Sequence, residues 1–126
     1  MTEQEAIAQG YTVIKTADEL QAMENNVSGK YILMNDIDLA GYDWTAVGTY
    51  DNPFAGEFNG NGYVISNLTI NEPTKQFQGL FGVGDARTSY SNVGLENVDI
   101  KGQRDIGALI GRFDTSISVS NCYSTG

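Results

Sequence analysis

The sequence predicts an all-β fold, a short parallel β-solenoid of about four coils with an N-terminal capping α-helix. Three observations support this prediction: one eight-residue pattern recurs, glycines recur ahead of its later copies, and a helix signal precedes the first copy. The copies are ILMNDIDL (32–39), YVISNLTI (63–70), VGLENVDI (93–100) and ISVSNCYS (117–124). Self-similarity at a spacing of about 20 to 50 residues is typical of solenoid proteins.

Written in register, the copies form four columns, apolar but for one serine, which we expect to face the core. The columns are Ile32, Tyr63, Val93 and Ile117; Met34, Ile65, Leu95 and Val119; Ile37, Leu68, Val98 and Cys122; and Leu39, Ile70, Ile100 and Ser124. Between the second and third columns the alternation breaks at a polar column, Asp36, Asn67, Asn97 and Asn121. We predict a corner between two short strands there, with the stacked asparagine amides hydrogen-bonded along the axis.

The N-terminal part has the signals of a cap for the first coil. After a polar leader, residues 11–15 (YTVIK) are rich in β-branched residues, as a short strand would be. Thr16 and Glu19 form a capping-box pattern that predicts a helix through about Asn26. We therefore expect a single domain over 1–126, with a strand and a capping helix in 11–30 and stacked coils in 31–126.

Glycines recur ahead of the later copies. The segments are GEFNG (56–60), GLFG (79–82) and GALIG (107–111). Glycines at a recurring place in a coil indicate tight bends or a close approach of backbones that a Cβ would obstruct.

A family resemblance rests on these same segments. GLFGVG (79–84) and GALIGRF (107–113), each followed by an N-V or N-C step, together with 31–39 and 52–70, resemble the GLUG repeat proteins over about residues 11–126. The resemblance implies a right-handed β-helix that serves as a binding scaffold in bacterial surface proteins, including adhesins and immunoglobulin A proteases. It implies no catalytic residues.

The charge is concentrated in the first half of the chain. The net charge is −9, and residues 1–74 carry all of it, because 75–126 balance five acids with five bases. No basic residue lies between Tyr31 and Thr74. Such a field repels nucleic acids and attracts basic surfaces. The candidate partner-binding residues are Asp36, Asp38, Asp43, Asp51, Glu57 and Glu72.

The composition gives little support to catalysis, a metal or a cofactor. The chain has no histidine and one cysteine, Cys122, which falls in an inward column. Calcium would be the first choice of ion, at Asp36, Asp38 or Asp43, but the EF-hand pattern is incomplete. We expect no metal site and no cofactor, and we interpret Trp44 as a packing residue. A calcium-dependent polysaccharide-cleaving enzyme remains a remote alternative, since Asp38 and Asp99 would share an outward column with Thr69 and Tyr123.

Two non-catalytic functions remain open. In the first, the acidic face docks on a basic, nucleic-acid-binding surface of a partner protein, as an anti-CRISPR-like inhibitor that imitates nucleic acid would. In the second, the chain is a module of a secreted adhesin or immunoglobulin A protease that binds a host protein or glycan. The absence of a signal-peptide pattern favours a cytoplasmic protein, with the cell surface as the alternative if the chain is a fragment. We expect no direct binding to nucleic acid or membrane, and a possible homodimer through the C-terminal edge of the solenoid.

Overall fold

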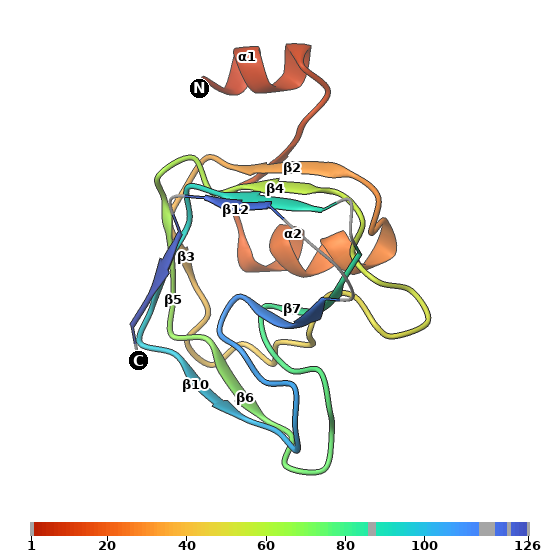
Figure 1. Ribbon diagram of the computed structural model, residues 1–126. Helices are drawn as coiled ribbons and strands as arrows, with labels where there is room; N and C mark the ends of the chain where they lie inside the picture. The colour runs from red at the N-terminus through yellow and green to blue at the C-terminus, as the bar shows by residue number, and fades with distance from the viewer. Residues whose placement is uncertain (1, 86–87, 114–117, 121, 126) are drawn as a thin grey trace.

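The computed structural model describes residues 2–85, 88–113, 118–120 and 122–125 and is composed mainly of short β-strands (Figure 1). The all-β prediction is confirmed at this level. The strands are β1 (Thr12–Ile14), β2 (Lys30–Leu33), β3 (Ile37–Asp38), β4 (Glu57–Asn59), β5 (Val64–Ser66), β6 (Thr69–Asn71), β7 (Phe81–Gly84), β8 (Ser89–Ser91), β9 (Gly94–Glu96), β10 (Asp99–Lys101), β11 (Ile110–Phe113), β12 (Ser118–Ser120) and β13 (Tyr123–Ser124).

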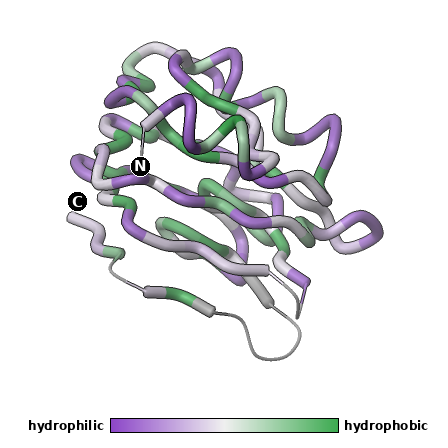
Figure 2. Tube along the Cα trace, turned by 90° about the horizontal axis from the view of Figure 1, so that it is seen from above, coloured by the Kyte–Doolittle hydropathy of each residue, from purple (hydrophilic) through white to green (hydrophobic). Residues whose placement is uncertain are grey.

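The strands form several small parallel sheets. Sheet A has the order β1-β2-β4-β8-β12, sheet B the order β13-β9-β5-β3, sheet C pairs β11 with β7, and sheet D pairs β10 with β6. From β4 onward the chain visits A, B, D and C in this order, and then repeats it from β8. Seen from above, the passes lie side by side, with the N-terminal helices toward one end and β12 at the other (Figure 2).

The core lies between the sheets and is rich in aromatic rings. Phe81 of β7 packs against Phe54, Phe58 and Tyr90, with ring centroids 4.7, 5.3 and 4.8 Å away. All four rings are buried to at least 99%. Because Phe58 and Tyr90 belong to sheet A, these contacts join sheet A to sheet C.

The N-terminal residues form two helices. The predicted strand at 11–15 is confirmed as β1, and the predicted helix begins after Thr16 as α2 (Ala17–Gln21), continuing as a 3₁₀ turn over Ala22–Asn25. The expectation that residues 1–10 are only a polar leader is wrong, because Glu3–Ala8 form α1. The missed signal is Thr2 followed by Glu5, a second capping box in which both reciprocal hydrogen bonds are made.

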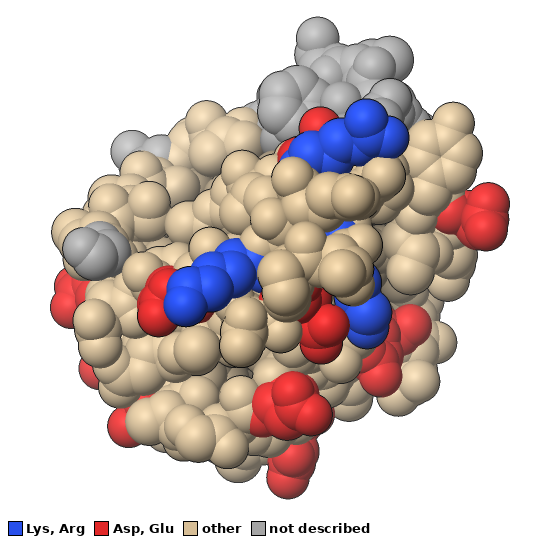
Figure 3. Space-filling view, turned by 90° about the horizontal axis from the view of Figure 1, so that it is seen from below, with Lys and Arg blue, Asp and Glu red and all other residues tan. Residues whose placement is uncertain are grey.

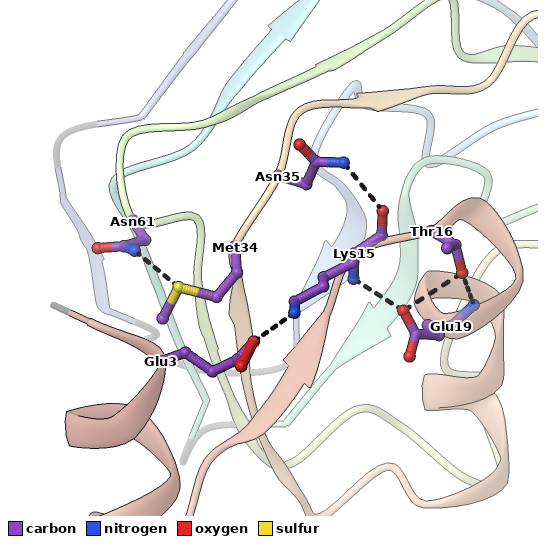
Figure 4. A network of polar contacts seen from close by, with 7 residues as sticks. All are labelled: Glu3, Lys15, Thr16, Glu19, Met34, Asn35 and Asn61. Carbon is purple, nitrogen blue, oxygen red and sulfur yellow. Dashed lines mark hydrogen bonds and ion pairs between the residues drawn. The ribbon is translucent and has the colours of Figure 1, made fainter.

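Polar contacts hold these helices to β1 (Figure 4). Glu3 of α1 forms an ion pair with Lys15 at the end of β1. The backbone N–H of Lys15 donates to Glu19 Oε1 at 2.9 Å, and Glu19 N donates to Thr16 Oγ1 at 3.1 Å. The α2 segment thus starts on a satisfied cap, and its Leu20 is fully buried in the core cluster.

The predicted register of the four copies is right for two of them. Ile65 pairs with Leu95 and Ile70 with Ile100, as the columns require. The columns are wrong for the first and last copies, since Ile32 pairs with Asn59 and Val119 with Tyr90. The second and third copies turn the corner from sheet B to sheet D, whereas the first and fourth turn the corner from A to B.

Glycine permits the close approach of successive passes. A Cβ at Gly79 would collide with the carbonyl oxygen of Gly107, and one at Gly82 would lie 2.5 Å from the carbonyl oxygen of Gly48. Both positions belong to the recurring glycine segments, so the prediction of close backbone approach is confirmed. Among the described residues, no helix is long and apolar enough to cross a membrane.

Candidate functional site

The first two candidate acids flank Ile37 of β3 and act as hydrogen-bond acceptors. Asp36 lies at the corner between sheets A and B, whereas Asp38 ends β3 and lies next to the corner at which Asn67 stands. Asp36 Oδ1 accepts from the backbone N–H of Val64 at 2.8 Å. Asp38 Oδ1 accepts from Ala40 N at 2.9 Å and from Asn67 Nδ2 at 2.8 Å. The Asn67 amide, and then the Ala40 N–H, hold the pKa of the Asp38 carboxyl below its usual value. Asp36 therefore stabilises the corner between sheets A and B, and Asp38 stabilises the next corner, where Asn67 stands.

The other four acids are distributed over separate parts of the surface. Glu57 lies on β4 and accepts from the Tyr11 hydroxyl at 3.2 Å. Asp51 is exposed in the loop between β3 and β4, while Asp43 and Glu72 line one hollow. Glu72 also pairs with Lys75 at 3.6 Å.

The structure thus brings Asp36 near Asp38, and Asp43 near Glu72, without gathering all six acids into one cluster. Figure 3 shows one face of the molecule, on which acidic and basic side chains are interspersed. A role of these six residues in partner binding stays a prediction.

The asparagine column forms a hydrogen-bonded ladder with a different first member. Asn97 Nδ2 donates to Asn67 Oδ1 at 2.6 Å, and Asn67 Nδ2 donates to Asp38 rather than to Asp36. Asp36 was the wrong choice because Ile37 pairs with Ile65, which places Asp38 in the adjoining position. Asn121, the fourth predicted member, lies outside the described residues.

The same shift separates Asp38 from Asp99. Asp99 pairs with Thr69 in sheet D, whereas Asp38 pairs with Ser66 in sheet B. Tyr123, which was expected in the same outward column, pairs with Gly94. The predicted column is therefore right for Thr69 and Asp99 and wrong for Asp38 and Tyr123, so the spacing of Asp38 and Asp99 that prompted the enzyme alternative is wrong as well. Within the described residues, no group of three or more His, Cys, Asp or Glu could hold a metal ion.

Two adjoining hollows lie on either side of Trp44. One has a volume of about 220 Å³ and extends toward Tyr50 and Phe77; the other has about 340 Å³ and extends toward Tyr42. Trp44 and Glu72 line both. We call the two hollows together the Trp44 groove.

Trp44 itself is mainly a packing residue, as the sequence predicted. It is 4% exposed, and its Nε1–H donates to the carbonyl oxygen of Leu80 at 3.1 Å. Tyr42 tilts against it at a centroid distance of 6.4 Å and donates a hydrogen bond of 2.9 Å to Asp18. That hydrogen bond to a carboxylate raises the pKa of the Tyr42 hydroxyl.

Sequence reasoning missed the other end of the Trp44 groove. Tyr50 and Phe77 stack there, with centroids 6.1 Å apart and ring planes 22° apart. The available signal was Phe77 itself, which precedes Gly79 by two residues. The equivalent position before Gly107 is occupied by a polar residue, Asp105. An aromatic residue at a corner position is unusual, but without the register it could not be connected to Tyr50.

The protein is thus an all-β protein of small parallel sheets with a surface groove. Comparison with known proteins identifies proteins of similar sequence and structure. No family model matches the sequence. Halomucin of Haloquadratum walsbyi is 32% identical over 114 residues, which cover 80% of this chain and 1% of Halomucin. A protein of Evansella cellulosilytica, provisionally named a Gly-rich membrane protein, is 34% identical over 110 residues, covering 79% of this chain and 13% of that protein.

A solved structure resembles most of this chain. It is the crystal structure of a Bacteroides ovatus protein provisionally named an immunoglobulin A1 protease. The match has a TM-score of 0.70 and 27% sequence identity, and it covers 90% of this chain and 37% of that chain. This chain therefore spans only a part of each protein that it matches.

These relatives overturn the expected location. We expected a cytoplasmic protein, but the relatives are named as a mucin, a membrane protein and an immunoglobulin A1 protease. Such names point to a protein that is secreted, exposed on the cell surface or associated with the membrane. The cytoplasmic prediction is wrong because it depended on the absence of a signal-peptide pattern from this sequence.

Proposed function

We propose that this chain is a non-catalytic binding module of a secreted or surface-exposed protein. The observation that carries the proposal is the match of about 80 to 90% of the chain to one part of longer proteins. A unit that recurs inside longer chains is typical of a structural or binding module. The relatives favour this reading over a mimic of nucleic acid, for which none of their names gives support.

We further infer that the module is a right-handed β-solenoid of the GLUG-repeat kind. Support comes from the chain's return to sheets A, B, D and C in a constant order and from the parallel pairing of successive passes. The recurring glycine segments give additional support, because each of the three contains a glycine whose Cβ would collide with a backbone oxygen of another pass. A rigid stack of this kind presents surface side chains in fixed positions, as a binding scaffold requires.

The non-catalytic part of the proposal is supported by the roles of the acidic corner residues. The carboxylates of Asp36 and Asp38 accept hydrogen bonds from backbone N–H groups and, at Asp38, from the side-chain amide of Asn67. A general acid must give a proton to the substrate and a general base must take one from it. A carboxylate whose oxygens already accept structural hydrogen bonds is poorly placed for either role.

Cell fractionation tests the location. An antibody against this chain should detect the full-length protein of the source organism in the cell envelope or the culture medium. A cytosolic enzyme is followed as the fractionation control. Recovery of the protein in the cytosolic fraction alone would contradict the proposal.

Incubation with immunoglobulin A1 tests the absence of catalysis. We expect the 126-residue chain to leave the immunoglobulin heavy chain intact on denaturing gels, with an authentic immunoglobulin A1 protease as the positive control. Specific cleavage that survives further purification of the chain would refute the non-catalytic proposal.

A further inference from the structure

The Trp44 groove has an aromatic wall at each end and polar side chains between the walls. Tyr42 stands at one end and Tyr50, stacked on Phe77, at the other, while the edge of Trp44, which is 4% exposed, lies between them. The two hollows, of about 220 and 340 Å³, are together within the range of about 300 to 1,000 Å³ that small-ligand sites occupy.

Tyr50 is presented to solvent on a closed loop. Its side chain is 62% exposed. The loop is closed by reciprocal backbone hydrogen bonds, Thr49 N to Asn52 O at 3.0 Å and Asn52 N to Thr49 O at 3.2 Å. A ring held in this way is preorganised, so that a ligand stacking on it need not order the loop.

Phe77 occupies a backbone conformation that an aromatic residue rarely adopts. Its φ is +59°, whereas the other described non-glycine residues with positive φ are all asparagine or aspartate. At the corresponding place one pass later stands Asp105, with φ +58°. A bulky residue in the left-handed region costs of the order of 1 kcal/mol or more. An aspartate occupies the equivalent corner one pass later, so the corner itself does not require an aromatic ring; at this corner the ring of Phe77 stacks on Tyr50 and helps to form the end of the groove.

The polar lining between the walls is largely neutral. It includes Gln76, Gln78, Thr45 and Thr49, whose side chains are polar and uncharged. The Gln78 amide already donates a hydrogen bond of 2.9 Å to the carbonyl oxygen of Gln76. Glu72 is partly neutralised by Lys75 at 3.6 Å. Amides and hydroxyls can donate and accept, and the carboxylate of Glu72 can accept a strong hydrogen bond from a hydroxyl.

We propose that the Trp44 groove binds a neutral saccharide, an inference that rests on the proposed function as a binding module. A sugar ring carries C–H groups on its faces, which fit the electron-rich faces of aromatic rings, and hydroxyls at its rim, which fit the amides and the carboxylate. Asp43 and Glu72 disfavour phosphate or nucleic acid. The Glu72–Lys75 pair leaves less negative charge for a basic peptide, which is the competing ligand.

Fluorescence of the single tryptophan, Trp44, gives a direct readout. The chain is screened on an array of neutral glycans and titrated with cellohexaose, maltohexaose, xylohexaose and chitohexaose. At least one should change the emission of Trp44, with a dissociation constant of about 1 mM or tighter. If no array glycan and none of the four hexaoses binds, the proposal is overturned. Octalysine is titrated in parallel, and binding of octalysine alone also overturns the proposal.

Three variants localise the binding. Tyr50→Ala should weaken saccharide affinity at least about tenfold, since it removes the exposed ring. Phe77→Asn should weaken affinity while the thermal midpoint stays the same or rises, because asparagine accepts a positive φ readily. Tyr123→Ala removes a ring that is 51% exposed on β13 and should leave affinity unchanged.

Equal loss of affinity in Tyr50→Ala and Tyr123→Ala would overturn the assignment of the groove. A lower thermal midpoint with undiminished binding in Phe77→Asn would assign Phe77 a purely structural role and also overturn it. A reducing-end assay on the same mixtures separates this inference from the proposed function. Saccharide cleavage would refute the absence of catalysis, whereas binding without cleavage leaves both proposals standing.

Discussion

Asn97 donates a hydrogen bond of 2.6 Å from Nδ2 to Oδ1 of Asn67, which stands at the same corner in the previous pass of the chain. Both residues have a positive φ, +56° and +61°. Asparagine meets two demands at this corner: it tolerates the left-handed conformation, and its amide can donate to one neighbour while accepting from another. The corner is therefore held together along the stacking direction by side chains as well as by the strands.

Substitutions at Asn67 separate these two demands. Asn67→Ala loses the hydrogen bonds to Asp38 and from Asn97 and also forces alanine to a positive φ, so we expect the free energy of unfolding to fall by about 2 to 3 kcal/mol. Asn67→Gly accepts the φ and loses only the hydrogen bonds, and should cost about 1 kcal/mol less than alanine. Urea denaturation measures both. Equal stability of the two variants would show that backbone strain contributes nothing here.

Acidification should weaken the same corner through Asp38. The Asn67 amide lowers the pKa of this carboxyl in the folded state, so its stabilising contribution is present above the unfolded pKa of about 3.9 and is lost as the pH falls through the folded value. We follow the thermal midpoint by circular dichroism from about pH 7 down to about pH 2 and expect it to decrease once the pH falls below the unfolded pKa. In Asp38→Asn, whose amide oxygen can still accept, part of that acid dependence should disappear. Identical pH profiles for the two proteins would contradict this role.

Gly56 tests the close approach of two passes. A Cβ at Gly56 would overlap the carbonyl oxygen of Gly29, which is part of the backbone and cannot move independently. Gly56→Ala should therefore lower the free energy of unfolding by about 1 to 3 kcal/mol or more. Gly102→Ala is the matched control, because there the Cβ would meet Cδ1 of Ile106, the end of a side chain that can turn away. Chemical denaturation should show a change below about 1 kcal/mol for the control. The interpretation fails if both variants are equally stable.

Tyr90 carries a buried hydroxyl in the aromatic core. The residue is 0% exposed, and among the described residues its hydroxyl makes no hydrogen bond of standard geometry. Burial raises the pKa of this hydroxyl well above its ordinary value, although the Thr88 side chain is near enough to lower that pKa slightly. Tyr90→Phe removes the unsatisfied group without changing the packing, so we expect the free energy of unfolding to rise by about 1 kcal/mol. Tyr90→Ala should lower it by about 3 to 5 kcal/mol. A loss of stability in Tyr90→Phe, measured by thermal denaturation, would reveal a hydrogen bond to this hydroxyl.

The outer edges of sheets A and B test self-association. β12 and β13 are edge strands among the described residues, and they expose Val119 to 49% and Tyr123 to 51%. We expect the 126-residue chain to form end-to-end dimers through this edge, and Val119→Lys to shift them to monomers, because a charge on an edge strand opposes strand pairing. Sedimentation velocity over a range of concentrations measures the shift. A wild-type chain that stays monomeric throughout would refute the prediction.

Much of the candidate site could not be read from the sequence. The acidic stretch was visible as a charge pattern. The pattern does not show which carboxylates accept hydrogen bonds within the fold, as those of Asp36 and Asp38 do. The Trp44 groove depends on Tyr50 and Phe77, which come from different loops and meet only when the passes stack. Such a contact has no periodic signature, because it is made once.

The sequence by itself determined the kind of structure: short strands, corners at asparagine, glycines at close approaches and a helix capped by Thr16. These features follow from local conformational preference, which each residue carries with it. Only the tertiary structure decided which corner each copy occupies, and so why Asp38 rather than Asp36 joins Asn67 and Asn97. The physical reason is that the corners of sheets A, B and D make similar local demands. One pattern therefore fits more than one corner, and the pairing of whole strands across the core selects among them.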